Sequence, residues 1–203
     1  DKEHNIKEQL AAAHTSVAEL YLTDLCWEET AEQECGYQLD RALQYAPDSM
    51  DAVQTLANLK CSQSKFQDAL PLVWRVYTSM ETACQSLASL VGLRERTTTA
   101  AATELLELNQ VQSLPSFEFR CQTAKLLLEC SGMAAANNNG EQPQASPTSA
   151  EQCAQAAIDI LGSLLAENDQ VIEIWMVVGD AFAILEQSDD SSHYYWERAL
   201  EML

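Results

Sequence analysis

The chain has 203 residues, 47% of them hydrophobic, and carries a formal net charge of −20 because 31 Asp and Glu outnumber 11 Lys and Arg. A surface of that sign repels nucleic acid and anionic lipid, so the charge argues against direct binding of either and favours a cationic partner. The plain alternative is that the acidity only keeps the protein soluble.

Several absences narrow the class of protein further. Six glycines and five prolines are few for this length, which favours long helices over many short strands. No apolar run reaches the roughly 18–20 residues that a membrane span needs, and no signal peptide is visible. The chain opens at Asp1 without a methionine and stops inside an apolar pattern at Leu203, which we interpret as the mark of a fragment.

The first predicted unit is a helical hairpin at 16–49. Its second helix carries a small residue at Cys35, a large one at Leu39 and an alanine at Ala42, and Pro47 closes the unit. This order and spacing are typical of the tetratricopeptide repeat, in which two helices form one unit of about 34 residues.

A step of one repeat period leads to two further units, at 50–83 and 84–116. The second unit carries small and branched apolar residues at the core positions of both helices. The third unit is more degenerate, because its second helix fits only with a shift of one residue, through Ala102 and Leu106, and Pro115 ends it.

The remaining chain gives a fourth unit at 117–171 and a fifth at 172–203. The fourth is interrupted at 131–150, a stretch rich in Asn, Gly, Pro and Ser that we predict to be a disordered insertion. The sequence therefore predicts a single all-α domain over 1–203, a tetratricopeptide-like solenoid of about five hairpins wound as a right-handed superhelix.

Motifs for catalysis or cofactor binding are missing from the sequence. The seven cysteines form no CxxC pair and most lie in apolar helical patterns, so we expect small buried side chains in a reducing compartment. The three histidines are His4, His14 and His193, and they do not have the spacing of a metal site. No glycine-rich phosphate-binding loop occurs in the sequence. We predict no catalytic residue, cofactor or metal, and no enzymatic activity.

Several segments resemble a eukaryotic family of dedicated ribosomal-protein assembly chaperones, which includes the chaperone of large-subunit ribosomal protein L four. The likeness is carried by 21–26, 31–35 and 42–52, with weaker echoes at 114–129 and 171–182. It implies a repeat superhelix that captures a basic extension of a newly made ribosomal protein, with L four as the expected partner. It also implies shielding in the cytoplasm and delivery to the nucleus for assembly of the large subunit.

The resemblance places the binding surface on the first helix of each hairpin. The carboxylates there would pair with Lys and Arg of an extended peptide, Trp27 would stack on a guanidinium, and Asn58 would hold the peptide backbone. The alternative is an ordinary solvated polar face. The candidate partner-binding residues are Asp24, Trp27, Glu28, Asp51, Asn58, Glu118, Glu129, Glu173 and Asp180.

Two other functions remain open from the sequence. A generic tetratricopeptide scaffold in a multiprotein complex would have the same fold. The related adaptors of heat-shock chaperones are disfavoured, because they grip an acidic tail with groove Lys and Arg and this surface is mostly acidic. We expect a monomer that binds a basic protein segment and makes no direct contact with nucleic acid or membrane.

Overall fold

The computed structural model describes residues 2–96, 115–136, 149–185 and 189–203. Over these residues the regular structure is helical and no strand occurs, which confirms the predicted all-α class. No helix in this part of the chain combines the length and the apolar character needed to cross a membrane. The helices are α1 (Lys2–Leu22), α2 (Ala31–Tyr45), α3 (Met50–Ser62), α4 (Phe66–Arg96), α6 (Phe117–Ala136), α7 (Ala150–Glu167), α8 (Ile172–Ile184) and α9 (Asp189–Glu201).

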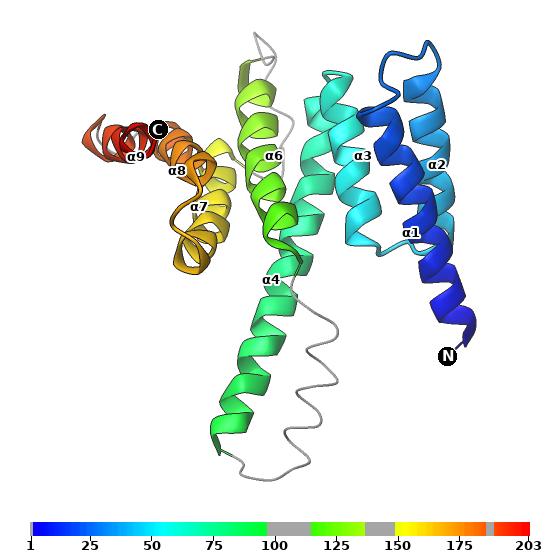
Figure 1. Cartoon of the computed structure of the whole chain (residues 1–203), viewed down its shortest axis with the longest axis horizontal. Coiled ribbons are helices and arrows are strands. Elements are labelled where there is room, and N and C mark those ends of the chain that lie inside the picture. The colour runs from blue at the N-terminus through cyan, green and yellow to red at the C-terminus, as the bar shows by residue number, and fades with distance from the viewer. Residues whose placement is uncertain (1, 97–114, 137–148, 186–188) are drawn as a thin grey trace.

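The helices pair in chain order into hairpins that stack side by side (Figure 1). In the described residues these hairpins are α1/α2, α3/α4, α6/α7 and α8/α9. The second helix of each hairpin packs against the first helix of the next. The first helices α1, α3, α6 and α8 also contact one another in that order, so they form a continuous row. This is the tetratricopeptide-like helical repeat that the sequence predicts.

The core runs without interruption through the hairpins that follow α2. Its largest fully buried side chains include Leu126 and Leu127 of α6, Leu161 and Leu164 of α7, and Ile174 of α8. A smaller cluster around Cys35, Leu39 and Leu59 joins the first hairpin to α3. Each hairpin thus buries its apolar face against its neighbours, as expected for a solenoid.

A buried polar contact fixes α6 against α3. The side chain of Gln54 is only 8% exposed, and its Nε2 donates to the carbonyl of Phe119 at 2.9 Å and to Thr123 Oγ1 at 2.7 Å. Two helical turns further along both helices, Cys61 Sγ lies 3.2 Å from Cys130 Sγ. A buried amide must find its partners, so this contact allows one register between the two helices.

The predicted start of the first unit at residue 16 is wrong. Helix α1 begins at Lys2 and ends at Leu22, and its buried residues are the small Ala11, Thr15 and Ala18. These residues have the spacing of one helix face, but they lack the large side chains on which the repeat period was set.

The predicted boundary at residue 84 is also wrong. Helix α4 continues from Phe66 to Arg96, so no new hairpin begins at Cys84. The residues around that position include no Gly or Pro, and nothing in the local sequence ends a helix there. The core positions expected at Ala102 and Leu106 lie outside the described residues.

The predicted insertion at 131–150 begins too early. Helix α6 extends through Ala136, and Ser131 is buried with its hydroxyl donating to the carbonyl of Leu128 at 3.0 Å. Helix α7 begins at Ala150 after a capping box formed by Ser149 and Gln152. The intervening 137–148 lies outside the described residues.

Helix α1 also carries an exposed line of large apolar side chains on the side opposite its buried residues. We call this line the α1 apolar row. Its members and their exposed fractions are Ile6 at 56%, Leu10 at 40%, Val17 at 38% and Leu20 at 46%.

The fourth hairpin depends on a glycine. A Cβ added at Gly179 of α8 would lie 2.3 Å from Nε1 of Trp196 on α9, so Gly179→Ala must displace the indole. We expect this variant to lose about 1–3 kcal/mol of unfolding free energy, measured by urea denaturation. The matched control is Gly162→Ala in α7, where a Cβ meets nothing within 4 Å. It should gain about 0.5–1 kcal/mol, and an equal loss in both variants would contradict the packing of α8 on α9.

The third hairpin depends on an ion pair whose effect varies with pH. Arg120 donates to both carboxylate oxygens of Glu167, at 2.6 and 2.7 Å, and these hydrogen bonds lower the pKa of Glu167 below its ordinary value. A lowered folded-state pKa gives stabilisation that is present at neutral pH and disappears as the group is protonated.

Glu167→Gln should therefore be less stable than the wild type at pH 7, and the difference should shrink as pH falls from about 5 to about 3. The Glu167 side chain is 47% exposed, so we expect the pH-dependent part to be about 1 kcal/mol or less. Asp40→Asn is the control for the loss of one negative charge, because this exposed carboxylate of α2 forms no ion pair within the described residues. Urea denaturation at each pH measures both differences.

Candidate functional site

Helix α6 lies at the centre of the predicted binding surface. One of its faces carries four polar residues spaced by four, three and four positions: Glu118, Gln122, Lys125 and Glu129. This face contacts both neighbouring first helices. Gln122 Nε2 donates to Asn58 Oδ1 on α3 at 3.2 Å, and Lys125 forms an ion pair with Glu173 on α8.

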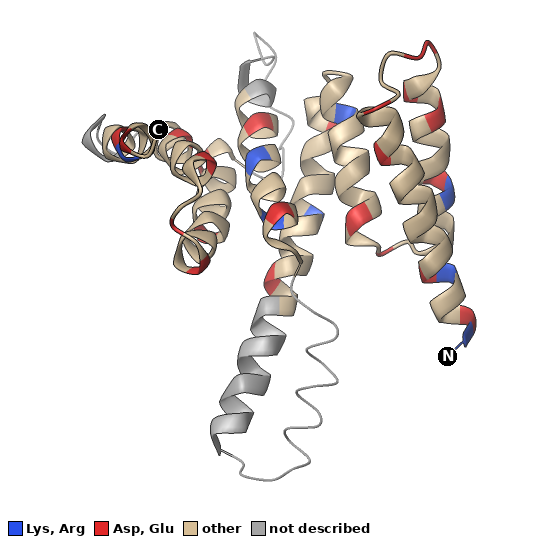
Figure 2. Cartoon of the chain, in the orientation of Figure 1, with Lys and Arg blue, Asp and Glu red and all other residues tan. Residues whose placement is uncertain are grey.

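Helices α3 and α8 continue the same surface. Asp51 and Asn58 lie two turns apart on α3, and Glu173 and Asp180 lie two turns apart on α8 with the 52% exposed Met176 between them. Acidic residues are spread over all the hairpins (Figure 2). Those on this surface form what we call the carboxylate row: Asp51, Glu118, Glu129, Glu173 and Asp180.

The members of the carboxylate row differ in what they contact. Glu173 is neutralised by Lys125, and Asp180 accepts a hydrogen bond from Trp196 Nε1 at 3.2 Å. The side chains of Asp51, Glu118 and Glu129 make no hydrogen bond or ion pair with another residue of the described ranges, and all three are exposed. These three carboxylates are therefore available to a cationic partner without first breaking an internal contact.

A hollow of about 520 Å³ opens between α6 and α8 and brings Glu118 and Glu173 together. Phe117 and Val171 give it apolar walls, and Cys121 lies on its buried side. Burial raises the pKa of the Cys121 thiol, which keeps the thiol neutral and makes it a poor nucleophile. The hollow can therefore accommodate an apolar stem next to a charge, which suits a side chain better than a chemical reaction.

The prediction that Asp24, Trp27 and Glu28 lie on the first helix of a hairpin is wrong. They lie at 23–30, in the turn between α1 and α2. Helix α1 ends before them, at Leu22, and two side-chain bonds to the backbone hold the turn that follows. Thr23 Oγ1 donates to the carbonyl of Glu19, and Trp27 Nε1 donates to the carbonyl of Asp24, both at 2.9 Å.

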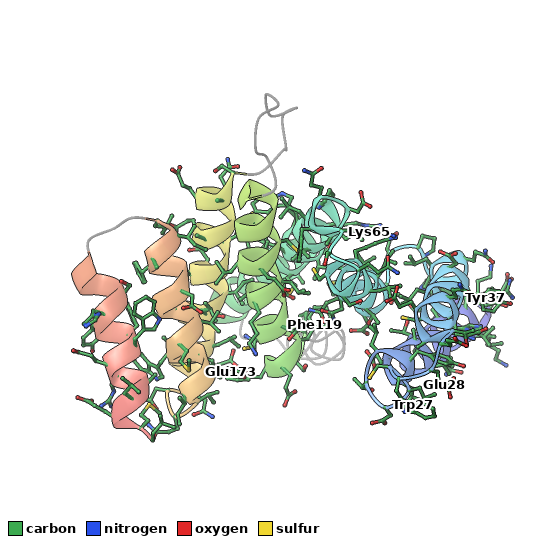
Figure 3. All side chains as sticks on the ribbon, turned by 90° about the horizontal axis from the view of Figure 1, so that it is seen from above. Trp27, Glu28, Tyr37, Lys65, Phe119 and Glu173 are labelled. Atoms are coloured by element: carbon green, nitrogen blue, oxygen red, sulfur yellow. The ribbon has the colours of Figure 1, made fainter. Side chains whose placement is uncertain are left out.

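The turn is nevertheless an exposed acidic surface. Trp27 is 76% exposed although its indole nitrogen is bonded to Asp24. Viewed from above, Trp27 and Glu28 lie along the same side of the molecule as Phe119 and Glu173, and Lys65 lies on the opposite side (Figure 3). The turn thus adds to the side of the molecule on which the carboxylate row lies, although by a different local structure from the one predicted.

One residue of the surface was not predicted from the sequence. Gln122 lies on the same face of α6 as Glu118 and Glu129, and its spacing of four from Glu118 could have identified it. Asn58 was predicted to hold a peptide backbone. Its Oδ1 accepts one hydrogen bond from Gln122, which leaves its Nδ2 group and the second lone pair of Oδ1 for a ligand.

The described part of the chain offers no metal site, and its cysteines differ in exposure. No group of three His, Cys, Asp or Glu side chains there has metal-binding geometry. Cys26 is exposed, in contrast to the burial expected for most cysteines, whereas Cys35 is fully buried and burial raises its pKa to about 11. The surface offers recognition of charge and shape.

Known proteins share this fold and part of this sequence, although no protein-family model matches the chain. A Schizosaccharomyces pombe protein named "Probable assembly chaperone of rpl4" is 26% identical over 175 residues, which are 86% of this chain and 39% of that protein. A solved structure named "Assembly Chaperone of RpL4 (Acl4)" superposes with a TM-score of 0.57 at 22% identity, over 94% of this chain and 51% of that one. The predicted resemblance is confirmed, and this chain spans about half or less of each of these proteins.

The exposed turn between α1 and α2 gives a test of its own. Because Asp24 is exposed and Glu28 half-exposed, and neither side chain is in an ion pair within the described residues, reversing both charges to Lys should change the unfolding free energy by no more than about 0.5 kcal/mol. Leu39→Asp is the control, since Leu39 is fully buried and a charge there should unfold the first hairpin. Circular dichroism during urea denaturation measures both, and loss of helicity in the double reversal would mean that the turn carboxylates support the hairpin.

Proposed function

We propose that this chain is a dedicated chaperone that binds a basic, extended segment of a newly made large-subunit ribosomal protein, with ribosomal protein L four as the partner. The carboxylate row and the acidic turn around Trp27 form the binding surface. In this proposal the chain acts as a monomer in the cytoplasm and nucleus, and it works by binding, without catalysis.

The observation that carries the proposal is the acidic surface on the first-helix row of a fold shared with a chaperone of RpL4. The sequence relationship to the fission-yeast protein supports the same partner, because it extends over 86% of this chain. A generic scaffold would need the fold but would not need carboxylates gathered on one surface.

The charge of the surface suits a ribosomal protein segment. Such segments carry many Lys and Arg and bind RNA and other polyanions nonspecifically before assembly. Exposed carboxylates at Asp51, Glu118 and Glu129 can form charge-assisted hydrogen bonds with those side chains. A protein surface that occupies the cations in this way competes with polyanions and requires no energy input.

Charge reversal tests the surface directly. Glu118→Lys combined with Glu129→Lys should weaken binding of a synthetic L four extension by about tenfold or more, because two attractive contacts become repulsive. The matched control is Asp40→Lys combined with Asp68→Lys on α2 and α4, which changes the net charge equally on second helices. Fluorescence anisotropy measures the affinity, and equal weakening by both double variants would mean that only overall charge matters.

The same assay distinguishes this proposal from the scaffold alternative. Raising the ionic strength from 0.1 to 1 M shortens the screening length from about 10 Å to about 3 Å, so wild-type affinity should drop steeply with salt. If the L four extension does not bind the wild type even at low salt, the dedicated-chaperone proposal is wrong and the generic scaffold describes the protein better.

A further inference from the structure

A second and larger hollow lies at the edge of the molecule where three hairpins meet. It has a volume of about 650 Å³, within the range of ligand-binding sites. Its walls come from the N-terminal half of α1, the turn between α2 and α3, and the first turns of α3 and α6. Of the residues predicted as partner-binding, only Asp51 reaches it.

The hollow combines apolar walls with an acidic rim. Ala12, Met50 and the half-buried ring of Phe119 contribute apolar surface. Three carboxylates line it, from Glu8, Asp48 and Asp51, and no Lys or Arg is among the lining residues. An apolar wall beside carboxylates matches a side chain that has an aliphatic stem and a cationic head.

The three carboxylates are not equally available. Asp48 is paired with Arg75, whose guanidinium lies 2.7 Å from Asp48 Oδ1 and also donates to the carbonyl of Pro47. Glu8 contacts only the imidazole of His4, at 3.1 Å, among the residues described. Asp51 has no such side-chain partner in the described ranges, so Glu8 and Asp51 carry the charge that a ligand would meet.

One aromatic ring at the rim of the hollow, that of Tyr45, already contacts an arginine of the chain. The guanidinium of Arg41 lies 5.3 Å from the centre of the Tyr45 ring and donates to the Tyr45 hydroxyl at 2.9 Å. Tyr45 is therefore occupied by an internal arginine, whereas no cation of the described residues lies over the Phe119 ring. A planar guanidinium can pack its flat face on such a ring while its edge donates to carboxylates, which a lysine ammonium cannot do.

We infer that this hollow is an arginine pocket. Glu8 and Asp51 bind the edge of the guanidinium of an arginine side chain, its flat face packs on the Phe119 ring, and Ala12 packs on its aliphatic stem. The inference rests on the proposed function, because the arginine would belong to the bound basic segment. It adds a specific anchor to a surface that otherwise recognises charge. It also extends the binding site to α1, beyond the carboxylate row.

The pocket can be tested without the ribosomal segment. The probe is Nα-acetyl-arginine N-methylamide, and its neutral isostere Nα-acetyl-citrulline N-methylamide is the matched control. Backbone amide shifts in two-dimensional NMR spectra should move at Ala12, Asp51 and Phe119 with the arginine compound. The citrulline compound should bind about tenfold more weakly, because it lacks the charge that strengthens the hydrogen bonds.

Two variants of different kinds locate the binding. Glu8→Gln combined with Asp51→Asn removes the charges, and Ala12→Leu fills the hollow without changing charge. Both should abolish the local shifts, and Asp40→Asn should not. The spectra themselves report whether each variant is folded.

Two results would contradict the arginine pocket. In one, the arginine compound shifts the backbone amides near all exposed carboxylates of the protein equally. In the other, the citrulline compound causes amide shifts as large as those of the arginine compound. The outcome is separate from that of the proposed function. If the arginine compound binds here but the L four extension does not bind the protein, the pocket stands and the partner is wrong. If the extension binds the wild type and the Ala12→Leu variant equally, the partner stands and the pocket does not hold its arginine.

Discussion

The side-chain amide of Gln54 fixes the geometry on which the binding surface depends. It is buried between α3 and α6 and satisfied by Thr123 and by the backbone of Phe119. A sliding of α6 by one residue would leave that amide without partners, at a cost of about 1–3 kcal/mol for the buried group. The same register places Gln122 against Asn58 and sets Phe119 at the edge of the arginine pocket. Apolar packing alone would tolerate more than one alignment, so a single buried amide decides which carboxylates lie next to one another.

A few of the carboxylates form ion pairs within the protein, and many more face solvent. Glu167 forms an ion pair with Arg120, which joins α7 to α6. Glu173 forms an ion pair with Lys125, which joins α8 to α6. Because the chain has 11 Lys and Arg for 31 Asp and Glu, most carboxylates cannot each have a basic residue of their own as a partner. The repulsion among them is a standing cost of the folded state, and a cationic ligand would relieve it. Binding and folding are therefore expected to stabilise each other.

The helical class and the tetratricopeptide-like packing could be predicted because Cys35, Leu39 and Ala42 have the spacing of one helix face, Pro47 closes the unit, and similar units follow at a step of about 34 residues. The faces of α3, α6 and α8 followed from the same period. Helix α1 was misplaced because its buried face is made of small residues, and α4 was divided because a period cannot reveal that a helix simply continues. The arginine pocket was missed for a different reason. Glu8 and Phe119 are more than a hundred residues apart in the sequence, and no spacing rule connects residues that meet only through the stacking of hairpins.

The α1 apolar row has a consequence for the colloidal behaviour of the protein. The α1 apolar row is exposed hydrophobic surface through which two molecules could associate. Electrostatic repulsion between strongly negative molecules opposes that association. That repulsion vanishes near the isoelectric point of about 4.2, where the row is as exposed as before. Acidification towards this point should therefore lower the solubility of the protein, because it neutralises the charge that keeps the molecules apart.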